Sequence, residues 1–281
     1  MLNPITTIIL TFNEEDNIKA CLESVLPISK QVFIVDSGST DQTLSIAKQY
    51  QVKIIHHAFE NYSLQRNWAL KHLPIGTDWV LNVDADHRIS QELTAELRIV
   101  FNQEIPIQTT GFLTSRRTIF MDRWIKYGGH YPTYHCVLFR KDFGYCEHKL
   151  YDQHFVVEGK LIQLKGDVID ILTSSLKTFT ERHNKWSDLE AVDHFENLKL
   201  ENVITPKRSG NPIEQRRYIK SMYERSPLFL RAFIYFFIRY FLRLGFLDGK
   251  EGLIFHTLQG LWFRLLIDAK IYELRKKHNL K

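Results

Sequence analysis

The first hundred residues alternate short apolar runs with segments of helical periodicity. Consecutive apolar residues predict buried strands over residues 7–11, 32–35, 52–55 and 79–83. Helical spacing of apolar residues between these runs predicts helices over 15–25, 39–50, 63–72 and 90–101, the last capped by Ser90. Strands and helices that alternate in this way favour an α/β fold with a mostly parallel, doubly wound sheet.

Polar residues follow three of the predicted strands where the chain leaves the sheet. Asn13 and Glu14 follow the first strand, residues 36–41 follow the second, and residues 84–86 follow the fourth. Ligands of open α/β sheets bind beyond the carboxyl ends of the strands. We therefore expect these three clusters to face one crevice.

The pattern changes after the fourth strand. Residues 109–172 are less regular and rich in aromatic residues and glycine, and they predict a second half of the same domain with a strand or two returning to the sheet. The stretch 205–212 contains two prolines and a glycine and is the best linker candidate. Residues 228–243 and 253–277 then predict two amphipathic helices.

Charge is unevenly distributed along the chain. Residues 207–281 carry 16 Lys and Arg against 6 Asp and Glu, a balance of +10, whereas residues 1–206 carry 21 against 26, a balance of −5. The basic segment predicts an anionic partner for this part of the chain: a membrane surface, nucleic acid or an acidic substrate.

The C-terminal segment favours the first of these partners. Arg231, Arg239 and Arg243 interrupt its apolar residues, so no run reaches the roughly 20 apolar residues that a spanning helix needs. We expect peripheral membrane contact through residues 228–277, with aromatic side chains in the headgroup region and cations toward anionic lipid. The alternative is packing on the catalytic domain or on a second subunit of a homodimer. No nucleic-acid recognition motif accompanies the cations, so nucleic acid is not expected.

The compartment is predicted from two weaker signals. The three cysteines are scattered and lack metal-binding or redox spacing, which favours a reducing, cytoplasmic setting. The N-terminal residues show neither the basic region nor the long apolar core of a signal peptide. With the basic segment, this predicts a place on the inner face of the cytoplasmic membrane.

The carboxylates after the fourth strand have the spacing of a metal site. Asp84 and Asp86 flank Ala85, and hard cations such as Mn²⁺ or Mg²⁺ commonly bridge such oxygen ligands to substrate phosphates. An isolated pair of this kind more often caps a helix. Residues 36–41 (DSGSTD) have hydroxyls and carboxylates suited to a ribose and base, but also the composition of a capping turn. Arg66 suits a phosphate or carboxylate, with a surface salt bridge as the alternative.

Four ordered motifs resemble the family 2 glycosyltransferases, which have a GT-A fold. They are residues 11–14 (TFNE), 36–41 (DSGSTD), 65–70 (QRNWAL) and 79–86 (WVLNVDAD). The resemblance spans residues 4–200 and is nearest to bacterial enzymes of lipopolysaccharide core, capsule and exopolysaccharide synthesis. It implies an inverting enzyme that moves a sugar from a nucleotide diphosphate, with a UDP-sugar as the expected donor, to a glycan or lipid-linked acceptor.

The same resemblance implies a domain plan. Residues 1–205 would be the GT-A catalytic domain, with a nucleotide-sugar half over 1–105 and an acceptor half over 106–205. Residues 206–281 would be the basic, helical extension.

The resemblance also implies residue roles. The nucleotide-sugar site would contain Thr11, Asn13, Glu14, Asp36, Gly38, Ser39, Asp41, Arg66, Asp84 and Ala85. Asp86 would be the direct metal ligand, with Asp84 beside it and His154 as a further candidate. Inverting transfer needs a base to deprotonate the acceptor hydroxyl, for which Asp152 is favoured over Glu147, with a different residue as the remaining alternative. His87 and Arg88 depart from the family pattern, because an acidic residue frequently follows the pair.

Two other functions stay open at this level. A nucleotidyltransferase also needs paired carboxylates, but usually has a Gly-rich, basic phosphate loop near the N-terminus, where this chain is acidic. A membrane-bound scaffold with a degenerate nucleotide-sugar pocket would show no metal-linked nucleotide binding.

Overall fold

The computed structural model describes residues 4–172, 175–195 and 204–278, which divide into two compact units. The first unit comprises Met1–Arg116, Tyr134–Glu147 and Gln153–Ile171. The second comprises Arg117–Thr133, His148–Asp152 and Leu172–Lys281. That residues 1–205 form the catalytic domain and residues 206–281 an extension stays a prediction.

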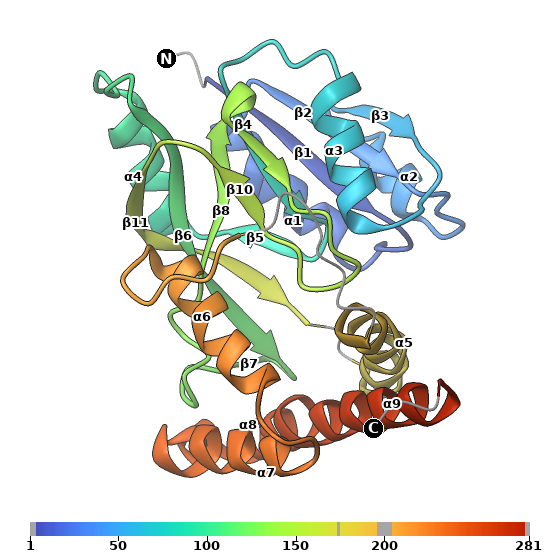
Figure 1. Cartoon of the computed structure of the whole chain (residues 1–281). Helices are drawn as coiled ribbons and strands as arrows, with labels where there is room; N and C mark the ends of the chain where they lie inside the picture. The colour runs from blue at the N-terminus through green and yellow to red at the C-terminus, as the bar shows by residue number, and fades with distance from the viewer. Residues whose placement is uncertain (1–3, 173–174, 196–203, 279–281) are drawn as a thin grey trace. The chain divides into compact units, whose positions relative to one another are not determined.

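The first unit holds nearly all of the β structure (Figure 1). Its strands are β1 (Ile5–Thr11), β2 (Gln31–Asp36), β3 (Lys53–His56), β4 (Trp79–Asp84), β5 (His87–Ile89), β8 (Tyr134–Arg140), β9 (Gly144–Cys146), β10 (Phe155–Val157) and β11 (Lys160–Ile171), together with most of β6 (Thr109–Phe120). Its helices are α1 (Ile18–Val25), α2 (Thr43–Ala47), α3 (Tyr62–His72) and α4 (Gln91–Phe101).

The main sheet combines a parallel and an antiparallel part. Its order is β3-β2-β1-β4-β8-β6-β11-β5, and β3, β2, β1 and β4 are parallel neighbours. From β4 onward the pairs β4–β8, β8–β6 and β11–β5 are antiparallel. Parallel pairing needs a crossover connection, usually a helix, and in the described part of the chain α1, α2 and α3 provide the connections between the four parallel strands. The α/β prediction and its four strands are confirmed, and the later strands join the same sheet.

Alternating side chains of the parallel strands bury both faces of the sheet. Ile9 and Ile34 join the cluster that contains the buried face of α1, whereas Ile8 and Phe33 join the cluster that contains Ala69 of α3. This two-sided burial explains why the strands read as continuous apolar runs. It also places α3 on one face, where it reaches the carboxyl edge of the strands.

Two of the four predicted N-terminal helices are shorter than expected. The helix predicted over 15–25 begins at Ile18, and that predicted over 39–50 is reduced to Thr43–Ala47. In both places the residues before the helix instead hydrogen-bond across the loops that follow β1 and β2, as described below. The other two agree closely, and the Ser90 hydroxyl accepts from the Leu93 N–H at 3.1 Å, as its predicted capping role requires.

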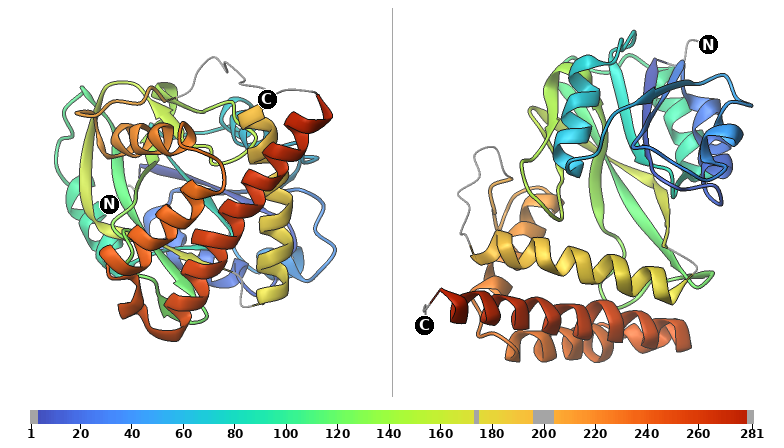
Figure 2. Two further views of the ribbon diagram at one scale, coloured as in Figure 1. Left: turned by 60° about the horizontal axis from the view of Figure 1, so that its bottom comes forward. Right: turned by 90° about the vertical axis from the view of Figure 1, so that its right-hand side faces the viewer.

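The second unit is mainly helical (Figure 2). Its helices are α5 (Leu176–Phe195), α6 (Pro212–Glu224), α7 (Leu230–Phe237), α8 (Gly249–Phe255) and α9 (Phe263–Lys277), with π-helical turns over Ile238–Leu242 and His256–Trp262, a 3₁₀ turn over Gly245–Asp248, and the short strand β7 (Arg123–Trp124). α9 runs beside α5 and buries Phe263, Ile267 and Ile271 against Ala191. No helix in the described part of the chain is long and apolar enough to cross a membrane.

Helix α6 was not predicted. The stretch 205–212 lacks regular structure up to Asn211, whose side chain accepts from the Ile213 and Glu214 N–H groups while the Glu214 carboxylate accepts from the Asn211 N–H. This is a complete capping box, so the linker candidate ends in a helix start.

Candidate active site

The loops that follow β1 and β2 are tied to each other by hydrogen bonds. Asn13 has a φ of 54°, and its side-chain oxygen accepts from the Thr40 N–H at 2.8 Å while its own N–H donates to the Ser39 hydroxyl at 2.9 Å. The Glu14 N–H donates to the Thr43 hydroxyl at 2.8 Å. The two predicted clusters therefore meet, as expected from the parallel strands that carry them.

Asp36 shapes the loop in which it lies. Its carboxylate is 2% exposed and accepts from the Gly38 N–H at 2.9 Å, the Ser39 N–H at 3.0 Å and the Ser39 hydroxyl at 2.5 Å. Gly38 has a φ of 98°, in the region that L side chains rarely adopt. Both Asp36 oxygens thus hold the turn. A capping turn was the alternative to a ribose and base site that the composition of residues 36–41 left open.

Asp41 holds the other end of this loop. Burial opposes the effect, but hydrogen bonds from Thr43 and from the Glu15 N–H lower the pKa of the Asp41 carboxyl. The charged form of Asp41 is therefore favoured where the loop joins α2.

Three potential ligands gather at the end of β4. Asp84, Asp86 and His87 each offer an atom within 4.8 Å of the others. His87 Nε2 lies 3.9 Å from Asp84 Oδ2 and 3.9 Å from Asp86 Oδ1. Asp84 is paired with Arg66, whose Nη2 donates to Oδ1 at 2.7 Å and to Oδ2 at 2.9 Å. Although burial acts in the opposite direction, the Arg66 guanidinium lowers the pKa of the Asp84 carboxyl.

The hydrogen bond made by His87 limits its role. Its Nδ1 accepts from the Asp84 N–H at 3.2 Å, so the proton of the neutral ring lies on Nε2, the atom nearest the two carboxylates. Binding a cation directly through Nε2 would require that proton to leave. The donor set fits a hard cation held by Asp84 and Asp86, and the Nε2–H group of His87 faces both carboxylates at 3.9 Å, beyond hydrogen-bond distance.

Two further groups close the turn around the carboxylates. Ala85 is buried and its N–H donates to the Leu10 carbonyl at 3.1 Å. Arg88 donates to the Ala85 carbonyl at 3.0 Å and to the Asn17 side chain at 2.9 Å, and Asn17 donates in turn to Glu14 at 2.8 Å. The turn is therefore linked to the loop after β1. Arg88 was noted in the sequence only as a departure from the family pattern, and Asn17 was missed.

Thr11 ends β1 at the same edge. The residue is 4% exposed, and within the described part of the chain its hydroxyl has no hydrogen-bond partner. Its N-terminal neighbour Leu10 pairs with Asp84 in the sheet register. Thr11 therefore lies beside the carboxylate cluster, and its role in the nucleotide-sugar site stays a prediction.

Three consecutive residues of α3 organise the region. Gln65 is buried and contacts Ser37 at 3.2 Å and the His57 carbonyl at 3.1 Å, which fixes the loops after β2 and β3. Arg66 holds Asp84, and Asn67 exchanges two hydrogen bonds with the backbone of Cys146, each of 2.8 Å. The sequence identified Arg66, but its two neighbours were quoted only as part of a motif.

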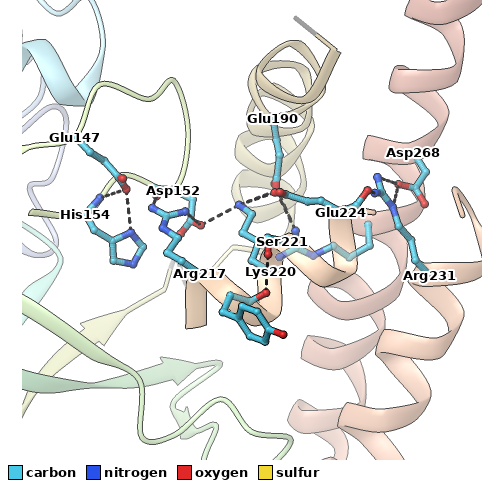
Figure 3. Close-up of polar contacts among 12 residues, drawn as sticks. Glu147, Asp152, His154, Glu190, Arg217, Lys220, Ser221, Glu224, Arg231 and Asp268 are labelled. Atoms are coloured by element: carbon cyan, nitrogen blue, oxygen red, sulfur yellow. Dashed lines mark hydrogen bonds and ion pairs between the residues drawn. The ribbon is translucent and has the colours of Figure 1, made fainter. Parts of the chain in front are cut away.

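Glu147 follows Cys146 and lies in the same unit as the carboxylate cluster. It is fully buried, and its Oε1 accepts from the His154 N–H at 2.8 Å and lies 3.4 Å from His154 Nδ1 (Figure 3). The His154 ring stacks on His135, with centroids 5.1 Å apart. His154 therefore faces Glu147 and is not one of the three clustered ligands at β4; its role as a metal ligand stays a prediction.

Asp152 belongs to the second unit, where helix α6 holds it. Its Oδ2 accepts from Arg217 Nη1 at 3.2 Å and from Lys220 Nζ at 3.0 Å, and its carbonyl accepts from Arg217 Nη2 at 2.7 Å (Figure 3). Lys220 also pairs with Glu190 at 3.1 Å. Burial opposes the effect, but Asp152 and Glu190 raise the pKa of Lys220. Asp152 has a φ of 56°, so this clamp also fixes an uncommon backbone conformation.

Comparison with known proteins agrees with this geometry. Residues 6–143 match the family described as Glycosyl transferase family 2. These residues are a family 2 glycosyltransferase domain. A protein of Rickettsia typhi named as an uncharacterised glycosyltransferase is 28% identical to this glycosyltransferase over 297 residues, which cover 98% of this chain and 89% of that protein. LpsC of Rhizobium meliloti, a lipopolysaccharide core biosynthesis glycosyltransferase, is 26% identical over 290 residues, with 99% and 94% covered.

A solved structure supports the fold of the glycosyltransferase. The mannosyltransferase PcManGT from Pyrobaculum calidifontis, in complex with GDP-Man and Mn²⁺, superposes with a TM-score of 0.51 at 12% identity, covering 96% of this chain and 87% of that one. The predicted GT-A fold and the family 2 resemblance are confirmed.

Proposed function

We propose that this glycosyltransferase is an inverting enzyme that moves a sugar from a nucleotide diphosphate to a glycan or lipid-linked acceptor in cell-envelope polysaccharide synthesis. The arrangement of Asp84, Asp86 and Arg66 carries the proposal, because two carboxylates and a guanidinium that pairs with one of them lie together at the carboxyl edge of the parallel strands. The likeness to LpsC supports the envelope role. We propose a UDP-sugar as the donor.

The proposal includes metal dependence. Asp84 and Asp86 would hold Mn²⁺ or Mg²⁺, which supplies neutralisation of the charge that develops on the departing diphosphate. Arg66 keeps Asp84 charged and oriented, and the Ala85 and Arg88 contacts keep the turn in place. The Mn²⁺ in the mannosyltransferase structure is in keeping with this site.

For the general base we propose Glu147. A base must present an oxygen lone pair to the acceptor hydroxyl, and because Glu147 is fully buried, the proposal requires that acceptor binding opens access to its carboxylate. Asp152, which the sequence favoured, already accepts from two cations at the same oxygen, whereas Glu147 is oriented by His154 and lies one residue after the Asn67 contact. Asp152 then serves to anchor the segment 148–152 to α6.

Glu147→Gln and Asp152→Asn test this assignment as a matched pair of isosteric amides. We expect Glu147→Gln to lower the turnover of sugar transfer by at least about a hundredfold with unchanged donor binding. Asp152→Asn should lower the melting temperature and retain most of the turnover. The reverse outcome would assign the base to Asp152.

We also propose that the enzyme is cytoplasmic and contacts the inner face of the cytoplasmic membrane through residues 228–277. The charge balance of +10 in residues 207–281 and the apolar, aromatic composition of this segment support peripheral contact. A lipid-linked acceptor would be reached from this position.

Calorimetric titration separates the proposed function from its alternatives. We expect UDP to bind in the presence of Mn²⁺, and Asp86→Ala to abolish both metal-linked binding and transfer. Tighter binding of GDP would redirect the donor assignment. A scaffold would show no metal-linked binding, a nucleotidyltransferase would release pyrophosphate from a nucleoside triphosphate, and full turnover by Asp86→Ala would reject the metal role.

A further inference from the structure

A stripe of exposed apolar side chains runs along the segment that begins at Phe229 and ends at Leu247. Within its helical part the exposed residues follow the spacing i, i+3, i+4, i+7, i+8 and i+11, which places them on one side of the helix: Leu230, Phe233, Ile234, Phe237, Ile238 and Phe241. Their exposed fractions range from 38% to 56%. We call the exposed apolar side chains of residues 229–247 the apolar face.

The apolar face is free of charge because two arginines of the same helix turn inward. Arg231 is 3% exposed; its Nε donates to Asp268 Oδ1 at 2.8 Å and its Nη1 donates to the Glu224 carbonyl at 2.9 Å. Arg239 donates to the Gly128 carbonyl at 2.7 Å and contacts His130 Nδ1 at 3.0 Å. In the sequence these arginines interrupt an apolar run. In the structure their side chains point away from the apolar face, so no charged side chain interrupts the exposed side of the helix.

The face is held in place before any partner arrives. Asp268, which is fully buried, accepts from the Phe229 N–H at 2.7 Å as well as from Arg231. The inner side of α7 packs on the π-helical turn His256–Trp262, and Ala232 is fully buried there. The outward orientation of the phenylalanines is therefore set by contacts on the opposite side of the helix.

The charge at the ends of the face identifies the partner. Residues 225–250 contain a single acidic residue, the buried Asp248, whereas the exposed cations are Arg225 at the start, Arg243 near the end and Lys250. A second copy of the chain docked on this face by a two-fold axis would bring the cations at the ends of one copy close to those of the other, which costs free energy. An anionic lipid surface complements both the apolar stripe and its cationic ends.

We propose that the apolar face inserts into the interfacial region of a membrane that contains anionic lipid. This rests on the proposed function only in that a lipid-linked acceptor would explain why the enzyme lies there. It shifts the expected contact from residues 228–277 to the shorter segment 225–250, because α9 exposes Tyr272 but buries Ile267 and Ile271. Arg225, Arg243 and Lys250 supply the cations, in place of the inward Arg231 and Arg239.

Flotation of the full chain with vesicles tests the proposal. Vesicles of phosphatidylcholine alone are compared with vesicles that contain three parts in ten of phosphatidylglycerol. We expect binding to the anionic vesicles, and at least a tenfold loss of it in Phe237→Ser/Phe241→Ser. The matched control is Ile99→Ser/Ile107→Ser, which removes two even more exposed apolar side chains from the first unit and should bind like the wild type. Arg225→Gln/Arg243→Gln should reduce binding to the vesicles that contain phosphatidylglycerol and leave binding to phosphatidylcholine vesicles unchanged.

Two outcomes overturn the proposal. One is that the wild type does not bind vesicles, or that the Phe237→Ser/Phe241→Ser variant, with an unchanged melting temperature, binds them as well as the wild type does. The other is a dimer in sedimentation velocity that this variant dissociates, with no lipid binding by either protein; a second copy is then the partner. Asp86→Ala should float with vesicles as the wild type does, because the metal site does not take part in lipid binding. Vesicle binding would therefore still be observed if the proposed glycosyltransferase activity were wrong.

Discussion

The side-chain amide of Asn67 exchanges two hydrogen bonds with the backbone of Cys146. Nδ2 donates to the Cys146 carbonyl and Oδ1 accepts from the Cys146 N–H, both at 2.8 Å. The next residue is Glu147, the proposed base. Helix α3 therefore fixes the backbone at Glu147 as well as holding Asp84 through Arg66.

Asn67→Leu should separate positioning from folding. The leucine keeps the volume but leaves two backbone groups without their partners, so we expect turnover to fall at least about tenfold while the dissociation constant for UDP stays within twofold. Lys71→Ala, an exposed change on the same helix, should leave both quantities unchanged. A variant with full turnover and a lower melting temperature would make the Asn67 contact purely structural.

Mn²⁺ should stabilise the folded protein through Asp84 and Asp86. At a metal concentration a hundred times the dissociation constant, we expect about 2.7 kcal/mol of added stability, visible as a higher melting temperature. Asp86→Ala should lose this increment, whereas Asp78→Ala, which removes an exposed carboxylate of the same unit, should keep it. An equal shift in Asp86→Ala would place the ion elsewhere.

Stability should fall in mild acid because of His183. Burial lowers the pKa of His183 to about 4, so between that value and about 6.5 the unfolded chain binds a proton that the folded chain does not. Stability is therefore full above pH 6.5 and decreases as the pH falls, by about 2 kcal/mol at pH 5. Urea unfolding of His183→Gln at pH 7 and pH 5 should show a decrease smaller by about this amount, and His72→Gln, at an exposed position, should match the wild type.

Replacing Arg231 alone should lower the free energy of unfolding more than replacing both Arg231 and Asp268. Both side chains are buried, so Arg231→Met leaves an uncompensated carboxylate, and we expect a loss of about 3–5 kcal/mol in the free energy of unfolding. Arg231→Met/Asp268→Leu should recover at least half of that loss. Losses that simply add in the double variant would show that the pair makes no net contribution.

The sequence predicted the strands and the carboxyl edge of the sheet well, because continuous apolar runs and the residues after them are local signals. It placed Asp84, Arg66 and Asn13 at one edge, and the structure agrees. It could not predict the Asn67–Cys146 contact, whose partners are 79 residues apart and share no pattern.

The C-terminal segment shows the same limit. Arg231 and Arg239 were expected to meet lipid, since a helical run with interspersed cations is typical of an interfacial helix. Only the position of Asp268, 37 residues after Arg231, and of the Gly128 carbonyl shows that these side chains turn inward. The direction of a long side chain depends on partners that a single helix does not contain.

The three contacts made by Gln65, Arg66 and Asn67 limit how this enzyme can diverge. One helical turn of α3 sets the spacing between the loops after β2 and β3, the turn that contains Asp84 and Asp86, and the β9–β10 hairpin. A one-residue insertion in this part of α3 would therefore displace all of these segments together. Relatives that accept a different sugar while keeping this turn should therefore differ in the loops that α3 does not hold.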